Sequence, residues 1–301
     1  MDTFDSSVRI GVDIGGTSMS VARVLDSGDI VGRIDIPSPA RESGARVVEE
    51  ITRIVRHNWP DAQSVGIGAA GVIDAEGTIL AASDSFNDWA GFALGQETQH
   101  ALGIPVRVEN DVNAFLLGET YAGVLAGTDT SLGLMLGTGV GGAIMLDGQI
   151  WHGPRGAAAE IGHMPGFGDL PCTCGGRGHI ETTSSGRGIA NRYTLTTGQH
   201  VQSAGEVAQA ARNGDATAVN ILVDAGRYAA LAIIQAATML DLTAVVIGGG
   251  VTRDWDYLME GITEVATKYP LISGAQLDIH RSVLGADAVL IGAARKGAQA
   301  C

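Results

Sequence analysis

The chain has 301 residues, of which 45% are hydrophobic and 17% are charged, so it can bury a sizeable core. Its net charge of −14, with no basic cluster to offset it, argues against nucleic acid as a partner. Neither a signal-peptide pattern nor an apolar run bounded as a membrane span is evident, so we expect a soluble, cytoplasmic protein without a membrane partner. The abundance of small residues, including 44 glycines, is typical of α/β proteins.

The first part of the chain alternates extended and helical patterns. Three apolar runs within residues 8–36, joined by "DIGGTS" and "DSGD", predict a β-meander. Residues 42–57 carry apolar side chains at helical spacing. "SVGIGAAG" and "PVRVEN" predict buried strands, and helices are predicted over residues 93–102 and 111–121, the second with Asp111 at its start.

The same pattern restarts near residue 131 as strand, glycine loop "GTGVGG", strand, turn and strand. Further strands are predicted at 243–247 and 276–280. Helices are predicted at 185–195, 204–213, 216–240, 254–269 and 286–296. A repeated pattern without a Pro- or Ser-rich linker predicts two similar α/β domains that pack directly, with a cleft between them.

Two glycine-rich turns open the two halves. "GTGVGG" satisfies G-x-G-x-x-G, but a strand follows it rather than a helix, which excludes a dinucleotide-binding fold. A pair of such hairpins can instead offer backbone N–H groups to phosphate oxygens, with Asp13 placed to hold hydrated Mg²⁺. The phosphate-binding candidates are Gly15, Gly16, Thr17, Gly137, Thr138, Gly139 and Gly141. The alternative is two ordinary tight hairpins.

The segment "GHMPGFGDLPCTCGGRGHIE", residues 162–181, concentrates possible metal ligands. His163, Cys172, Cys174 and His179 supply two sulfurs and two imidazoles, a normal set for tetrahedral Zn²⁺. The C-x-C spacing and the lack of a helical H-x₃₋₅-H pair exclude an ordinary zinc finger. The alternative is two reduced cysteines beside unrelated histidines.

Seven motifs occur in an order that resembles the ROK family of sugar kinases and related repressors. They are "GVDIGGTS", "VGIGAAGVIDAEG", "VENDVNAFLLGE", "LGTGVGGAIMLDG", "GAAAEIGH", "CTCGGRGHIE" and "VIGGGV". The resemblance implies duplicated actin/hexokinase-like (ribonuclease H-like) α/β domains with an interdomain cleft. It places a small domain at residues 1–118, completed by a helix at about 285–301, and a large domain at 119–284.

The resemblance also assigns roles to individual residues. Asp111 matches the general base, although an Asp at a helix start is commonly a simple N-cap. Gly248, Gly249 and Gly250 match the loop on the adenosine side of the nucleotide. The residues that match sugar ligands are Gly71, Asn110, Glu160, His163 and Glu181.

The chain departs from the family pattern at several positions. Ser18 stands where the family usually has Lys, which removes one positive charge near the phosphates. His179 stands where the family has a third zinc-binding Cys, and zinc accepts either side chain. In the segment before Trp89, Ser85 or Asn87 occupies the place of a family Asn that touches the sugar.

The implied activity is transfer of phosphate from ATP to the 6-hydroxyl of a hexose, with glucose the first candidate and N-acetylmannosamine the main rival. ATP, Mg²⁺ and a structural Zn²⁺ are the implied cofactors, and a homodimer is expected by analogy. Two other classes of protein are alternatives, a sugar-responsive repressor and a sugar-binding protein without activity. A repressor would carry a helix-turn-helix, but only about nine residues precede the first glycine loop. A sugar-binding protein without activity would not need Asp13 and Asp111.

Overall fold

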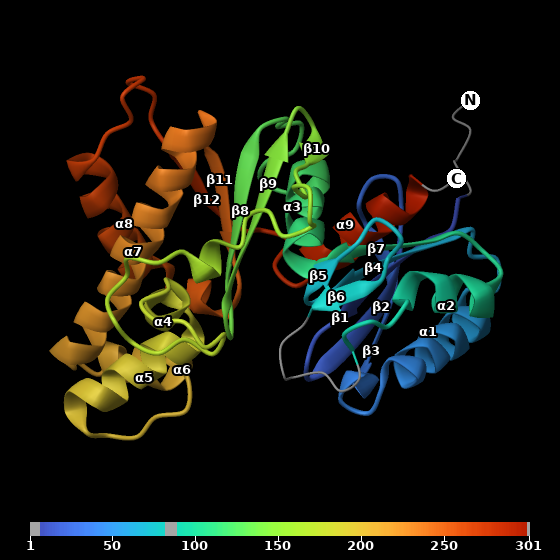
Figure 1. The fold of residues 1–301 in the computed structure, drawn as a ribbon, viewed down its shortest axis with the longest axis horizontal. Coiled ribbons are helices and arrows are strands. Elements are labelled where there is room, and N and C mark those ends of the chain that lie inside the picture. Colours follow the sequence, from blue (N-terminus) through green and yellow to red (C-terminus); the bar gives the residue numbers. More distant parts are fainter. Residues whose placement is uncertain (1–6, 82–88, 300–301) are drawn as a thin grey trace. The chain divides into compact units, whose positions relative to one another are not determined.

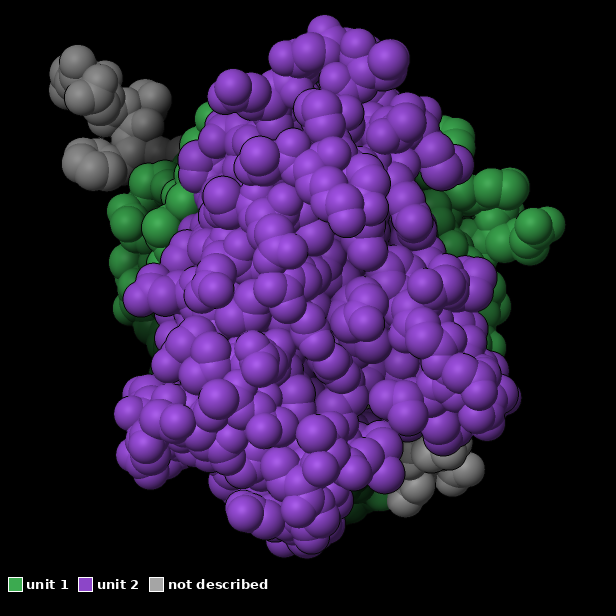
Figure 2. Space-filling model, turned by 90° about the vertical axis from the view of Figure 1, so that its left-hand side faces the viewer, with its two compact units in different colours: residues 1–129, 149–158, 283–301 green, residues 130–148, 159–282 purple. Residues whose placement is uncertain are grey.

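The structure, a computed structural model, describes residues 7–81 and 89–299. The chain forms two compact units, which Figure 2 distinguishes by colour. Unit 1 comprises residues 1–129, 149–158 and 283–301, and unit 2 comprises residues 130–148 and 159–282. Each unit contains a five-stranded sheet with helices, which confirms the predicted duplication of α/β domains.

The sheet of unit 1 begins as the predicted meander. Its strand order is β3-β2-β1-β4-β7 (Figure 1). β1 pairs antiparallel with β2 and parallel with β4, and β4 pairs parallel with β7. The strands are β1 (Arg9–Ile14), β2 (Ser18–Val24), β3 (Ile30–Pro37), β4 (Ser64–Ala69) and β7 (Val106–Asn110), with a separate hairpin of β5 (Val72–Ile73) and β6 (Ile79–Ala81).

The two faces of this sheet are covered differently. Ile10, Val12 and Ile14 of β1 alternate onto one face and pack into a core shared with α1 (Gly44–Asn58). The other face carries Gly11, where an added Cβ would lie 2.0 Å from the carbonyl oxygen of Leu290. Only glycine therefore lets α9 (Asp287–Ala298) lie this close to β1. α3 (Asp111–Ala122) packs against α9.

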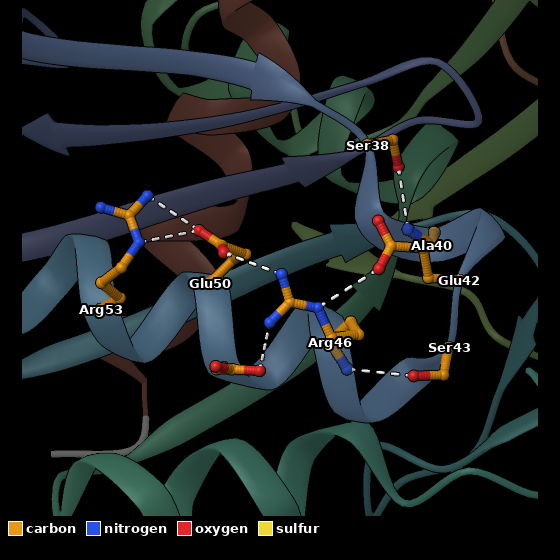
Figure 3. Close-up of polar contacts among 8 residues, drawn as sticks. Ser38, Ala40, Glu42, Ser43, Arg46, Glu50 and Arg53 are labelled. Atoms are coloured by element: carbon orange, nitrogen blue, oxygen red, sulfur yellow. Dashed lines mark hydrogen bonds and ion pairs between the residues drawn. The ribbon is translucent and has the colours of Figure 1, made fainter.

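Helix α1 begins at a side-chain cap and carries a surface ion-pair ladder. Ser43 Oγ accepts a hydrogen bond from the backbone N–H of Arg46 at 3.2 Å (Figure 3). The Arg46 guanidinium contacts Glu42 and Glu50, each at 3.3 Å, and Glu50 also pairs with Arg53 at 2.8 Å. Such exposed pairs contribute little stability, so the buried face of α1 is what holds it on the sheet.

Unit 2 repeats the strand order of unit 1. Its sheet runs β10-β9-β8-β11-β12, in which β8 pairs antiparallel with β9 and parallel with β11, and β11 pairs parallel with β12. The strands are β8 (Ser131–Leu136), β9 (Val140–Leu146), β10 (Gln149–Ile150), β11 (Ala244–Gly248) and β12 (Asp278–Arg281). β10 is the edge strand of this sheet, but together with the loop after it, residues 149–158, it belongs to unit 1.

The remaining helices build the core of unit 2. α7 packs against α8, and its buried residues include Ile221, Leu222 and Ile233. The helices are α4 (Glu181–Ser184), α5 (Gly186–Thr197), α6 (Ala204–Arg212), α7 (Ala216–Leu240) and α8 (Trp255–Lys268), and unit 1 adds α2 (Leu94–Leu102). Within the described residues, α7 alone has the length and apolarity of a membrane span, and 56% of its most apolar stretch is buried in the protein. It therefore serves as a core helix.

Candidate active site and metal centre

The glycine turn of unit 1 connects β1 and β2 and begins two residues after Asp13. The N–H of Gly15 donates to the carbonyl of Ser18 at 3.0 Å, which closes the turn, and Gly16 and Thr17 are at its tip. Gly15 does not adopt a positive φ, but an added Cβ would lie 3.2 Å from the carbonyl oxygen of Ser18, so the turn needs glycine for close backbone approach rather than for a left-handed backbone. Ser18, the residue that stands in place of the family Lys, is the first residue of β2 and is exposed.

The pKa of Asp13 is affected by a second carboxylate within unit 1, that of Asp111. Burial and the negative charge of Asp111 raise the pKa of Asp13 from 3.8 to about 7, and the nearby Arg33 guanidinium opposes this shift. Arg33 itself is held by Asp35 at 2.9 Å and by Ser20 Oγ at 3.2 Å. Two carboxylates that repel each other in a partly buried place suit a divalent cation with oxygen ligands, because its charge removes the repulsion. The residues present therefore fit a Mg²⁺ site.

Asn110, rather than Asp111, is the cap of α3. Asn110 Oδ1 accepts from the N–H groups of Val112 at 2.9 Å and Asn113 at 3.1 Å. Its Nδ2 donates to the carbonyl of Gly71 at 3.0 Å, where the backbone has a φ of +118°. The cap role considered for Asp111 thus belongs to its neighbour, and one Nδ2 hydrogen of Asn110 is still available for a ligand.

The structure brings a set of residues next to Asp111 that the sequence did not single out. The Glu109 side chain is only 4% exposed and pairs with Lys296 at 2.9 Å and with His152 at 2.9 Å. Its Oε1 also accepts from Asn113 Nδ2 at 2.9 Å. The sequence carries one clue to this cluster, since an acid that ends a buried strand needs a partner, but it does not name the partners.

The glycine turn of unit 2 joins β8 to β9 and is tied to α4 and α5. The N–H of Gly137 donates to the carbonyl of Gly139 at 3.0 Å, and the N–H of Gly186 donates to the carbonyl of Gly137 at 2.8 Å. An added Cβ on Gly137 would meet nothing within 4 Å, so the turn is open at this position. Thr138 is at the tip, whereas Gly141 lies within β9 opposite Met135.

The three glycines at the end of β11, Gly248 to Gly250, lie beside this turn. β8 and β11 are parallel neighbours, so their carboxyl ends meet at one edge of the sheet. Gly248 ends β11, Gly249 has a φ of +90°, and Gly250 begins a 3₁₀-helix. An added Cβ on Gly249 would lie 2.4 Å from the carbonyl of Leu136, the last residue of β8. Two glycine-rich segments therefore share one strand edge, the usual place for a ligand in an α/β sheet.

Four of the Cys and His residues of unit 2 converge. The ligand atoms of His163, Cys172, Cys174 and His179 all lie within 4.8 Å of one another. Cys172 Sγ is 3.9 Å from His163 Nδ1, and Cys174 Sγ is 3.3 Å from His179 Nδ1. Ligands of a tetrahedral zinc are spaced by roughly 3.3 to 3.8 Å, so the cluster fits Zn²⁺ with little adjustment.

The electrostatics of the cluster also favour a cation. Burial, together with the negative charge of Glu181, raises the pKa of the Cys172 thiol. A bound divalent cation would offset this penalty and deprotonate the sulfur. His163 is oriented for two tasks, because its Nδ1 faces Cys172 while its Nε2 is 3.9 Å from Glu160 Oε2.

Glu181 connects the metal cluster to the glycine turn. It is the first residue of α4, and its Oε2 accepts from the N–H of Val140 at 3.1 Å. Its Oε1 accepts from Thr173 Oγ1 at 2.9 Å and lies 3.6 Å from Cys172 Sγ. The predicted sugar ligands Glu160, His163 and Glu181 therefore lie at one candidate metal site in unit 2. Ser85 and Asn87 lie outside the described residues.

Two units of this topology, each opening with a glycine hairpin, define an α/β protein of the actin/hexokinase-like ATPase class. The ROK family profile matches residues 9–296, and the chain belongs to the ROK family.

Individual relatives agree with this assignment. A glucokinase of Halalkalibacterium halodurans is 33% identical over 94% of this chain and 92% of its own length. An N-acetyl-D-glucosamine kinase of Pasteurella multocida is 29% identical over 94% of this chain and 99% of its own. The structure of a ROK family glucokinase from Streptomyces griseus, in complex with glucose and AMPPNP, superposes with a TM-score of 0.81 at 30% identity, covering 97% of this chain and all of that chain.

Proposed function

We propose that the protein is an ATP-dependent sugar kinase that phosphorylates the 6-hydroxyl of a hexose, with glucose as the first candidate. The observation that carries the proposal is the placement of buried Asp13 within reach of the negative charge of Asp111 in unit 1, just before a glycine turn. One carboxylate of such a pair can bind a cation, and the other can accept a proton. The glucokinases among its relatives supply the substrate class.

The residues divide the reaction between them. Asp111 accepts the proton of the sugar hydroxyl, whose oxygen then forms the new bond to the γ-phosphorus while the bond to the β,γ-bridging oxygen breaks and ADP leaves. Backbone N–H groups of the turns at Gly15–Thr17 and Gly137–Gly139 orient the phosphates, and Gly248–Gly250 flank the adenosine. Mg²⁺, held through Asp13, would neutralise charge on the phosphates.

On the sugar side, Glu160, His163 and Glu181 bind hydroxyl groups, and Asn110 adds its remaining N–H. His163, Cys172, Cys174 and His179 would hold a Zn²⁺ with a structural role, because these four side chains would fill all four tetrahedral positions. ATP as phosphoryl donor is consistent with a cytoplasmic location, which we include in the proposal together with a homodimeric state.

The test compares the wild-type protein with Asp111→Asn on a panel of sugars, with ADP release as the readout. We expect turnover with glucose and a kcat lower by about 100- to 10,000-fold in the variant, because general-base catalysis supplies a factor of this size. Sugar binding measured by calorimetry should be largely retained. An active Asp111→Asn protein would refute the base assignment.

Two controls identify the acceptor. 6-Deoxyglucose lacks the acceptor hydroxyl, so it should bind and inhibit without supporting ADP release. N-Acetylglucosamine and N-acetylmannosamine represent the second candidate substrate class, which the N-acetyl-D-glucosamine kinase relative supports. A kcat/KM that is higher for an N-acetylated sugar than for glucose would move the assignment to that class.

A further inference from the structure

The Glu109 cluster is a buried polar feature of unit 1 that the proposed mechanism leaves unused. Glu109 is the residue before the cap Asn110 and two before Asp111, at the end of β7. Its carboxylate receives hydrogen bonds and charges from three separate parts of the fold. They are α3 through Asn113, α9 through Lys296, and the loop after β10 through His152.

The contacts of Glu109 lie on both sides of Asp111. On the amino-terminal side, Oε1 accepts from the backbone N–H of Asn110 at 3.1 Å. On the carboxyl-terminal side, the same oxygen accepts from Asn113 Nδ2 at 2.9 Å. The other oxygen, Oε2, receives Lys296 Nζ at 2.9 Å and His152 Nε2 at 2.9 Å. The strand-to-helix junction is thus fixed by one carboxylate, which is in turn clamped by a cation and an imidazole.

The carboxylate is ionised across the physiological range. Burial alone would favour its protonated form, but the His152 hydrogen bond and the charge of Lys296 outweigh burial and lower the pKa of Glu109 from 4.5 to about 2. An ionised carboxylate only accepts hydrogen bonds, so His152 Nε2 carries a proton and donates. Every partner of the Glu109 carboxylate therefore donates a hydrogen bond to it, so the contacts favour one orientation of this side chain.

Stability alone is a weak reason to keep this cluster. Apolar residues of similar volume often replace buried ion pairs at little cost or with a gain in stability. What an apolar residue could not do is accept the N–H of Asn110 and the amide of Asn113 and so set the direction of the first turn of α3. A displacement of about 1 Å in a catalytic group costs as much as 100-fold in rate, which gives such orientation a function.

We infer that Glu109 is a positioning residue for Asp111, and that Lys296 and His152 hold Glu109 in place. The inference rests on the proposed function, because it assigns Glu109 an effect on the base of that reaction. It adds two elements that are remote in the sequence, α9 and the loop after β10, to the determinants of the reaction rate.

The primary test is Glu109→Gln, which keeps the shape of the side chain and removes its charge. We expect kcat at saturating sugar and ATP to fall by about 10- to 100-fold. The KM for ATP should stay within about twofold, because the partners of Glu109, namely Asn110, Asn113, His152 and Lys296, have no role in nucleotide binding in the proposed function. Lys296→Met should lower kcat in the same way, while Lys296→Arg, which keeps the charge, should stay within about threefold of wild type.

A double variant separates positioning from general damage. If Glu109 acts through Asp111, adding Glu109→Gln to Asp111→Asn should leave the residual kcat unchanged within about twofold. If both losses multiply, the effect does not pass through Asp111 and the inference is wrong. Asp224→Asn is a matched control, since it breaks a partly buried pair with Arg192 in unit 2 and should change the melting temperature but not kcat.

The outcomes distinguish this inference from the proposed function. A folded Glu109→Gln protein with wild-type kcat, beside an inactive Asp111→Asn protein, would overturn the inference alone. An active Asp111→Asn protein would overturn both. Should Glu109→Gln fail to fold, the comparison of Lys296→Met with Lys296→Arg decides, because equal kcat values in these two variants would refute the clamp.

Discussion

Replacing Asp13 by Asn should stabilise unit 1 at neutral pH while it impairs the reaction. The pKa of Asp13 is raised from 3.8 to about 7 by burial and by the charge of Asp111. A carboxyl group that holds its proton more tightly in the folded state than in the unfolded chain costs stability once it ionises. For this difference the cost is about 4 kcal/mol, as an upper bound.

The direction of the Asp13 pKa shift determines the pH range over which stability changes. Below pH 3.8, Asp13 does not reduce the stability of the folded state. As the pH rises from 3.8 to 7, ionisation of Asp13 reduces this stability progressively, and above pH 7 the loss is constant. Asn cannot ionise, so the advantage of Asp13→Asn over wild type should be close to zero at pH 4 and reach up to about 4 kcal/mol at pH 8.

Urea unfolding in magnesium-free buffer without a chelator measures this difference and leaves zinc in place. Three of the four tryptophans, Trp59, Trp89 and Trp151, belong to unit 1, so fluorescence reports mainly on that unit. Asp61→Asn, at an exposed acid, is the control and should stay within about 0.5 kcal/mol of wild type. An Asp13→Asn advantage that is the same at both pH values, or a loss of stability at pH 8, would refute the reasoning.

Three further predictions address the metal cluster, the acid limb of stability and the glycine turn. Cys172→Ser should lower the zinc content measured by mass spectrometry and raise the KM for sugar more than the KM for ATP. His179→Cys, which restores the family pattern, should keep zinc. Equal loss of sugar binding and ATP binding in Cys172→Ser would indicate unfolding instead. The pKa of Glu109, lowered from 4.5 to about 2, gives about 3 kcal/mol of stability that is complete above pH 4.5 and is lost as the pH falls towards 2, so Glu109→Gln should flatten this limb in urea titrations. Gly139→Ala would place a Cβ 2.5 Å from Glu181 Oε2, so the KM for sugar should rise, and an unchanged value would show that Glu181 moves without consequence.

Local patterns were enough to predict most of the fold. The meander ahead of α1 and its repeat from residue 131 follow from short apolar runs separated by glycine turns, and both form as predicted. The periodic segment at residues 42–57 forms α1, and the long apolar segment forms α7 over the predicted Ala216–Leu240. These signals are strong because each depends on neighbours in sequence, namely turn residues and side chains on one face.

The details of the site depend on contacts that no local pattern encodes. An Asp at a helix start suggests a cap, but the structure gives this task to Asn110, whose side chain also reaches Gly71. His152 lies 43 residues from Glu109 along the chain and meets it only because the loop after β10 belongs to unit 1. The predicted domain bounds and the roles of the site residues stay predictions until variants test them.

A zinc ion at the cluster of His163, Cys172, Cys174 and His179 would explain how a chain segment with few apolar side chains can hold functional groups in place. Between Met164 and Ile180, the buried hydrophobic side chains are Phe167 and Cys172, and the other order comes from the Asp169–Arg177 pair at 2.9 Å and from turns. An exposed pair of this kind adds little stability, so the segment cannot offset its own loss of conformational entropy. A bound zinc would supply that free energy directly as folding energy. Because Glu181 lies 3.6 Å from Cys172 Sγ and accepts from the N–H of Val140, a zinc ion at the cluster would also order the glycine turn.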